Sequence, residues 1–434
     1  MLSFAQNLTM SFTFWILILS VVAGIILIEL YFAKKKGLKI YTMSDTLVNL
    51  SCGILERLFD FFWAVMLYLL FWWLFDNFTL WHIPSNPLTW FIGLLVADFL
   101  AYWHHRLSHE INVLWAAHIV HHQSEELNVT TVFRVSLFAV INRSFFFIWM
   151  PIMGFHPDLA ISTFIFVGAF QFVTHSRVVG KLGILDKIFS TPSNHRVHHA
   201  RNEKYIDHNY AHVFIIWDKI FNTYMPEEEE PLYGITTGFE STNAYSAQMF
   251  YWKDLFTRAR RTEKFMDKVR LFVKKPAWTP AEVGYLPPQF KTDENGNRLH
   301  HQRPVSTKFG VYMLANNVAT FGLFLWLVLH KRGMGADITV KGLLTDPAVL
   351  GIAAIILFAV YAHGRMLDNK PFAKIFDSIR LLAMAAILPI LFQGAEFTTW
   401  FNPILWLYCG GMMIWLWTMS AETVEQRVGD TALT

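Results

Sequence analysis

The sequence predicts an all-α, polytopic membrane protein with about nine transmembrane helices and a histidine-rich cap on the cytoplasmic face. Hydrophobic residues make up 54% of the 434 residues and charged residues only 16%, whereas soluble domains carry about a quarter charged residues. Histidines are concentrated, because 13 of the 18 lie between His104 and His212. The net charge of +3 excludes a nucleic-acid binder, and two cysteines are too few for a disulfide framework.

Five of the predicted spans lie in the first 175 residues. The first, residues 12–33, is long enough to cross a bilayer as a helix. By the positive-inside rule its far end faces the cytoplasm, because four lysines follow it between residues 34 and 39. A cleaved signal peptide is the alternative, but the residues before this run carry no charge. A polar stretch that contains Asp45, Arg57 and Asp60 separates it from the other four spans, which are residues 61–75, 88–103, 136–153 and 159–173.

Residues 176–304 contain no spanning run and are predicted to be a cytoplasmic segment of helices and loops. Within it, residues 258–275 interleave lysine and arginine with apolar residues, which predicts an amphipathic helix at an anionic lipid surface. The apolar pattern then returns and places the C-terminus in the cytoplasm. The four spans predicted there are residues 309–329, 348–362, 379–392 and 401–419.

Eight histidines form three short motifs, which are HRLSH at residues 105–109, HIVHH at 118–122 and HRVHH at 195–199. Positions i and i+4 share one face of a helix, so each motif presents two imidazoles on one stripe, with His121 and His198 beside the stripes. Eight imidazoles are more than one metal ion coordinates, so they predict two metals. Neutral imidazole binds iron, zinc, copper and nickel well. Because the motifs follow apolar spans, we expect a lipid substrate with an unreactive chain. Attack on such a chain needs activated oxygen, which iron can supply and zinc cannot, so we expect the metal to be iron.

At these residues the chain resembles the fatty acid hydroxylase/sterol desaturase superfamily of membrane di-iron oxygenases. The segments HRLSHEINVLWAAHIVHHQSEELNVTT and TPSNHRVHHARNEKYIDHNYAHVFIIWDKIFNTY are most similar to its alkylglycerol monooxygenase branch, over about residues 98–234. The resemblance implies a fatty acid hydroxylase-like membrane catalytic domain over residues 1–304. Residues 305–434 carry no motif that matches, so the role of this transmembrane helical region stays open.

The resemblance also implies which residues bind iron. His175 occupies a ninth histidine position of the family, although a histidine at a helix end is the alternative for it. Asn194 stands where the branch tends to have a further histidine, and His104 is an additional one that we expect beside the site. His208 and His212 are less favoured candidates. The implied iron ligands are His105, His109, His118, His121, His122, His175, His195, His198 and His199.

Three polar residues near the motifs are candidate catalytic residues. Asp98 lies seven residues before His105 inside a predicted span, and we expect its carboxylate to accept the second ring N–H of a ligand histidine. Glu110 orients an imidazole or the pterin, or else forms an interfacial salt bridge. Asn209 resembles a family position that contacts the site through water.

Three further residues have expected roles outside catalysis. Trp217 and Asp218 resemble a family signature whose expected role is packing. Arg143 lies inside a predicted span and is expected to contact a lipid headgroup, to pair with Asp98, or to extend to the bilayer surface.

The resemblance implies a monooxygenase that uses two irons, O₂ and tetrahydrobiopterin on an ether lipid and releases a fatty aldehyde. Zinc could replace iron in purified protein, because zinc binds most nitrogen sites more tightly than Fe(II). One alternative is a hydroxylase or desaturase of a sterol, fatty acyl or aminolipid substrate, served by a separate cytochrome b5- or ferredoxin-type donor. The others are a metal transporter and a catalytically silent lipid-binding protein. The expected partners are therefore the bilayer, a lipid substrate and, in the first alternative, an electron donor.

Overall fold

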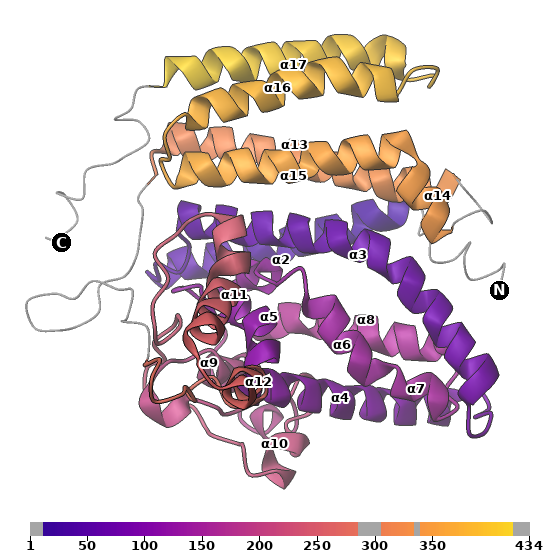
Figure 1. Cartoon of the computed structure of the whole chain (residues 1–434), viewed down its shortest axis with the longest axis vertical. Helices are drawn as coiled ribbons and strands as arrows, with labels where there is room; N and C mark the ends of the chain where they lie inside the picture. Colours follow the sequence, from indigo (N-terminus) through magenta and orange to yellow (C-terminus); the bar gives the residue numbers. More distant parts are fainter. Residues whose placement is uncertain (1–11, 285–304, 334–338, 420–434) are drawn as a thin grey trace, which may run out of the picture.

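The computed structural model describes residues 12–284, 305–333 and 339–419, and these residues form helices joined by loops (Figure 1). Among them the only β contact is an isolated bridge between Phe189 and Phe214, so the predicted all-α class is confirmed. The helices of the layered body are α2 (Phe12–Lys35), α3 (Met43–Phe78), α4 (Pro87–Glu110), α6 (Ala139–Phe147), α7 (Trp149–Ile152), α8 (Pro157–Thr174), α13 (Thr307–Gly333), α14 (Val340–Thr345), α15 (Pro347–Leu367), α16 (Ala373–Leu391) and α17 (Thr398–Thr418).

The remaining helices belong to a cap, which we define as residues 111–135 and 175–284. Figure 1 shows α9, α11 and α12 gathered at one end of the layered body, while α13 and α15 lie between α3 and the outer pair α16 and α17. The helices of the cap are α5 (Asn112–His122), α9 (Pro192–His198), α10 (Ile216–Ile220), α11 (Ala244–Arg261) and α12 (Phe265–Val273), with the 3₁₀ turns η1 (Val129–Phe133), η2 (Leu185–Lys187) and η3 (Glu203–Tyr205).

In the part of the chain that the structure describes, five helices are long and apolar enough to cross a membrane. The protein is therefore an integral membrane protein, but the predicted nine spans are not confirmed. Helices α16 and α17 are not among the five, although they lie alongside α13 and α15 (Figure 1). The Lys36 ammonium group donates to the Val178 carbonyl (2.8 Å), so the lysines after α2 lie on the side of the cap. The five candidate spans are Leu17–Lys35, Met43–Phe78, Pro157–Thr174, Thr307–His330 and Pro347–Leu367.

Two predicted spans have the wrong boundaries. Residues 136–153 do not form one span but the short helices α6 and α7, which break at Ile148. Pro151 follows closely and has no N–H to donate to the Phe147 carbonyl, which explains why one long helix does not continue. In contrast, α3 has 36 residues and extends through the polar stretch that was expected to lie outside it. The helix tolerates this stretch because Asp45, Asn49 and Glu56 find polar partners on neighbouring segments.

The C-terminal helices pack against the N-terminal region rather than standing apart from it. One apolar core contains Leu47 of α3, Ile119 of α5, Leu255 of α11 and Ile356 of α15. Polar contacts join the same parts: Ser51 donates to Asn317 (3.1 Å), and the carboxylate of Asp368, at the end of α15, accepts the Thr242 N–H just before α11 (2.8 Å). Residues 305–333 and 339–419 therefore support α3 and the cap from one side.

Candidate metal centre

Three helix ends and one loop residue bring the motif histidines together. Helix α4 ends with His105 and His109, and α5 follows after Ile111, whose extended backbone reverses the chain direction. Helix α9 carries the third motif, and His175 caps the end of α8. Because α4 packs against α5 and α8 against α9, residues far apart in the sequence point their imidazoles into one region.

The nine predicted ligands form two groups, and within each group the candidate ligand atoms lie within 4.8 Å of one another. In the described residues no other group of three or more metal-binding side chains meets this criterion. Helices α5 and α9 contribute to both groups, so the two centres are neighbours. The five-histidine group is His105, His109, His118, His122 and His198, and the four-histidine group is His121, His175, His195 and His199.

The distances within each group fit a bound metal. In the five-histidine group, the Nε2 atom of His118 lies 3.0 Å from Nε2 of both His105 and His122. Nε2 of His175 lies 3.0 Å from Nε2 of His195 in the other group. Two nitrogen ligands at right angles and about 2.1 Å from one metal are about 3.0 Å apart. A set of imidazoles without thiolates suits iron, zinc, copper or nickel.

The second ring nitrogen of several histidines fixes the tautomer that a metal needs. Carbonyl groups can only accept, so Nδ1–H of His105 donates to Tyr210 (2.7 Å) and that of His198 to His208 (3.1 Å). Nδ1–H of His175 donates to Gln171 (2.8 Å) in the same way. Each of these bonds leaves the Nε2 lone pair facing the centre of its group. Burial lowers the pKa of His198 well below the usual value for histidine, which keeps the ring neutral and able to bind a metal.

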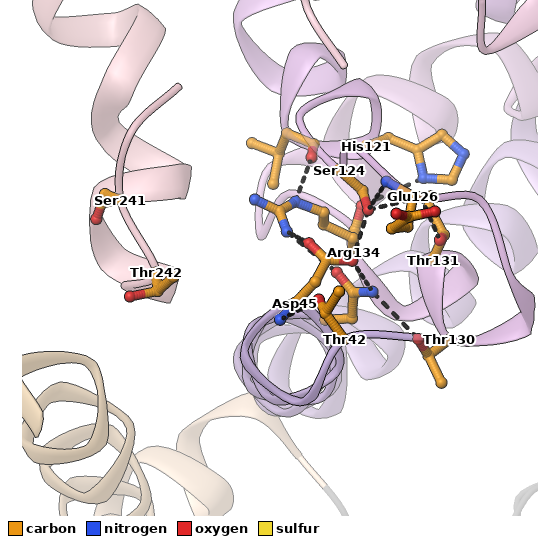
Figure 2. Close-up of polar contacts among 12 residues, drawn as sticks. Thr42, Asp45, His121, Ser124, Glu126, Thr130, Thr131, Arg134, Ser241 and Thr242 are labelled. Atoms are coloured by element: carbon orange, nitrogen blue, oxygen red, sulfur yellow. Dashed lines mark hydrogen bonds and ion pairs between the residues drawn. The ribbon is translucent and has the colours of Figure 1, made fainter. Parts of the chain in front are cut away.

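An ion pair between the buried Arg134 and the half-buried Asp45 supports the four-histidine group from the side of α3 (Figure 2). The Arg134 guanidinium donates to Asp45 (2.9 Å) and Asn49 (3.1 Å) of α3 and, through Nε, to the Val120 carbonyl of α5 (3.2 Å). The carbonyl of Arg134 in turn accepts Nδ1–H of His121 (3.2 Å). Arg134 therefore fixes the backbone that orients His121.

A loop of the cap supports the five-histidine group. The fully buried Asp218 carboxylate accepts the backbone N–H groups of Tyr210 and Ala211, each at 2.8 Å, and the Thr223 hydroxyl at 2.7 Å. These bonds hold the Tyr210 carbonyl where it accepts Nδ1–H of His105. Asp218 was expected only to contribute to packing, so this support of the loop was not predicted. A carboxylate within the apolar run IIWDKIF was the signal that could have indicated it.

The candidate catalytic residues have other partners than expected. Asp98 accepts the backbone N–H groups of Val213 (2.9 Å) and Phe214 (3.0 Å) and the Trp217 indole N–H (2.9 Å), so in the described residues it holds a cap loop and no ligand histidine. Its expected role as the acceptor for a ligand imidazole was therefore wrong.

Glu110 and Asn209 likewise contact no ligand imidazole in the described part of the chain. Glu110 pairs with Arg106 (3.1 Å), the salt bridge that was its alternative role. Asn209 is buried with a positive φ of 56° and joins two segments of the cap, because its amide donates to the carbonyls of Asn194 (3.0 Å) and Met225 (2.7 Å).

The other histidine and arginine candidates lie outside both groups. His104 is buried and packs against the Phe146 ring, and the ring of His212 lies 4.9 Å from that of His105. His208 contributes its backbone carbonyl rather than its partly exposed ring. Arg143 lies 3.7 Å from Glu56, so the alternative in which it pairs with Asp98 was wrong.

A cavity of about 440 Å³ opens onto the histidines. Its walls include three members of the five-histidine group, His109, His122 and His198, but only His199 of the four-histidine group. Apolar side chains of α5, including Trp115, form one wall. Charged side chains of α11 and of the loops line other parts of the cavity, together with uncharged residues: Arg201, Asp207, Asp254, Arg258 and Lys275. A molecule in this cavity would contact the histidines of both groups.

Comparisons with known proteins agree with this site. The fatty acid hydroxylase family model matches residues 90–223, which include all three histidine motifs. The alkylglycerol monooxygenases of Xenopus tropicalis and Homo sapiens are 32% and 31% identical to the chain, and each alignment covers 78% of the chain and 74% of the relative. Ornithine lipid hydroxylase OlsE of Rhizobium tropici is 34% identical over 31% of the chain and 40% of its own length. No solved structure matches.

Proposed function

The chain belongs to the alkylglycerol monooxygenase family of membrane lipid monooxygenases, and on this premise we propose that it oxidises the alkyl carbon beside the ether oxygen of an alkylglycerol. The single observation that supports this most is the pair of histidine groups at one cavity. We further propose that the nine histidines bind two irons and that the site faces the cytoplasm. The orientation is supported by the lysines that follow α2 on the side of the cap.

Two irons bound by these groups would supply the activation of O₂ for insertion into a C–H bond. One oxygen atom enters the substrate and the other leaves as water, so two electrons and two protons are required. We propose tetrahydrobiopterin as their source, on the resemblance of the histidine segments to the alkylglycerol monooxygenase branch. Hydroxylation beside an ether oxygen gives a hemiacetal, which breaks into a fatty aldehyde and the free glycerol hydroxyl.

The residues of the chain contribute orientation and exclusion of water. Three backbone carbonyls hold ligand imidazoles with Nε2 toward the centre of their groups. The carbonyl of Tyr210 holds His105, that of Arg134 holds His121, and that of Gln171 holds His175. The buried position of the groups keeps bulk water from the reacting carbon, and the walls of the cavity restrict how a bound chain lies.

The decisive experiment supplies the purified protein, reconstituted with Fe(II) in lipid nanodiscs, with an alkylglycerol, tetrahydrobiopterin and O₂. The expected result is a fatty aldehyde, formed with about two irons per chain. An acylglycerol of equal chain length is the matched control, because it lacks the ether-linked CH₂ group. Turnover with a ferredoxin or cytochrome b5 donor but never with the pterin would contradict the proposed reductant, and full activity with one metal per chain would contradict the di-iron centre.

A second candidate is hydroxylation of an aminolipid, which the 34% identity with an ornithine lipid hydroxylase over 31% of the chain favours. An ornithine lipid supplied in the same assay tests it, since its hydroxylated product is stable and adds one oxygen atom in mass. A metal transporter is disfavoured, because the histidines gather at helix ends and in the cap instead of following a path along the candidate spans.

A further inference from the structure

Helix α11 places an ion pair in the wall of the cavity that borders the histidine groups. Asp254 and Arg258 are one helical turn apart, their side chains are 2.8 Å apart, and both line the cavity. Arg258 is only 4% exposed, and its guanidinium also donates to the Tyr251 hydroxyl (3.0 Å). Tyr251 donates to the side-chain oxygen of Asn112 at the start of α5 (2.6 Å), which fixes α11 against the helix that carries three of the histidines.

Each member of this pair keeps one polar atom without a partner. Oδ1 of Asp254 and Nε of Arg258 are buried, and neither has a hydrogen-bond partner within the described residues. A buried polar atom without a partner costs free energy, so most such atoms in folded proteins are bonded to the protein, to water or to a ligand. An ion pair that lines the cavity therefore keeps one acceptor atom and one donor atom that a bound molecule could complete.

The chemistry of the pair selects the kind of group that it can bind. A carboxylate only accepts and a guanidinium only donates, whereas a hydroxyl does both. The pair has no net charge, so an anion beside it would meet the Asp254 carboxylate. The other charges in the cavity are mixed, because Arg201 and Lys275 are cationic and Asp207 is anionic. Uncharged hydroxyl groups therefore fit this pair better than an anion.

We propose that Asp254 and Arg258 bind the free hydroxyl groups of the glycerol headgroup of the substrate, an inference that rests on the proposed function. In an alkylglycerol these hydroxyls are only a few bonds from the carbon that is oxidised. When that carbon lies beside the histidine groups, the hydroxyls must lie in the same cavity. The pair thereby fixes which carbon of the alkyl chain faces the histidines.

The neighbouring helix supports access by a lipid. Helix α12 follows α11, and residues 275–277, directly after its end, line the cavity. Four of its apolar side chains are exposed, and Lys268 and Arg270 lie among them, as expected at a bilayer surface. The exposed apolar side chains of α12 are Phe265, Met266, Val269 and Val273.

The test compares the steady-state kinetics of the Fe-loaded protein in nanodiscs for two substrates: an alkylglycerol, and its analogue with both hydroxyls methylated. Arg258→Lys keeps the positive charge beside Asp254 but lacks the Nε–H donor, and Asp254→Asn replaces the acceptor. For the alkylglycerol we expect either variant to raise KM about tenfold to a hundredfold with a smaller change in kcat, as for loss of hydrogen bonds to a charged group. For the methylated analogue, we expect the same KM in the wild type and both variants.

Asp267→Asn is the matched control, because Asp267 forms a similar ion pair with Arg270 (2.8 Å) on the exposed side of α12; it should leave both KM values unchanged. Iron content and the KM for the pterin should stay constant in all variants. A variant that raises the KM for the pterin instead would assign the pair to the reductant and overturn the proposal, as would a wild type that does not distinguish the two lipids. Failure of the proposed function is recognised separately, because the wild type would then convert neither alkylglycerol nor its analogue.

Discussion

The histidine groups of the cap and the polar cluster around Asp377 in α16 are both buried among apolar helices, but they satisfy their polar atoms differently. In the α16 cluster, the Arg380 guanidinium donates to Asp377 and to Asn316, each at 2.6 Å, and the Tyr312 hydroxyl also donates to Asp377. In the histidine groups, by contrast, ring nitrogens converge on one another, and Nε2 of His109 and His198 has no hydrogen-bond partner in the described residues.

The difference separates a structural cluster from a functional one. In the α16 cluster, the donors of Arg380 and Tyr312 meet acceptors on Asp377 and Asn316, so these side chains join helices without a ligand. The neighbouring His363 ring, 3.8 Å from Asp377, has no hydrogen-bond partner in the described residues. The histidine groups contain several acceptors that meet no donor, and they border a cavity of about 440 Å³. A metal completes such a set, whereas it would disrupt the cluster of Asp377 and Arg380.

The largest effect is expected from His198→Ala, which removes a ligand of the five-histidine group. Loss of a residue that only supports a ligand typically weakens metal binding 10- to 100-fold, so loss of the ligand itself should lower aldehyde formation by more than about 100-fold. Iron per chain should fall below two while the protein remains inserted in the membrane. His82→Ala is the control, because His82 is exposed and belongs to neither group. Normal activity of the His198 variant would remove it from the catalytic centre.

Next in size is the effect of Arg380→Met on stability. Removing one partner of a fully buried ion pair leaves an unpaired charge and costs about 3–5 kcal/mol, so the unfolding midpoint in detergent should fall markedly. The iron content and kcat of the protein that stays folded should not change. The double variant D377N/R380M should recover part of the stability, since no charge is left unpaired. If Arg380→Met instead removed iron from a fully folded protein, the distinction between the two clusters would be wrong.

The spacing of the histidines predicted more of the centre than their number did. His118 and His122 are four residues apart and lie in one group, as do His195 and His199, whereas His121 and His198 belong to the opposite group in each case. Helical periodicity accounts for this division. It could not indicate which motif meets which, because that depends on how α4, α5, α8 and α9 pack.

Residues that act through the backbone were the least predictable. Asp98 and Asp218 both lie in apolar stretches near the motifs, yet Asp218 supports the loop that orients His105, and Asp98 holds the neighbouring residues. Their partners are backbone N–H groups of a loop with left-handed residues at Asp207 and Asn209. Sequence patterns do not specify such loop geometry. Similarly, the polar positions of α3 predict an interruption of the helix, and their partners on other segments explain why the helix continues.

A smaller effect is expected from Asp218→Asn. An amide side chain accepts hydrogen bonds only through its oxygen, so one of the two backbone N–H groups of Tyr210 and Ala211 loses its acceptor. The Tyr210 carbonyl then shifts relative to His105. We expect iron in the five-histidine group to bind 10- to 100-fold more weakly, while the four-histidine group keeps its metal. A cobalt(II) titration followed by absorbance measures the two binding steps. Asp98→Asn is the comparison variant and should weaken metal binding to the five-histidine group less than Asp218→Asn does. An equal change would mean that the whole loop, and not Asp218, orients His105.

The smallest effect is expected from Arg134→Lys, which tests the support of the four-histidine group. Lysine keeps the ion pair with Asp45 but cannot also donate to the Val120 carbonyl, so the backbone at residue 134 loses part of its restraint. Because His121 is held by the backbone carbonyl of residue 134 and not by its side chain, the metal affinity of this group should fall by less than about tenfold. In the same cobalt titration, the affinity of the five-histidine group for cobalt should stay unchanged. A change in that affinity alone would mean that the two groups are supported as one unit, and that the division between loop and membrane-helix supports does not hold.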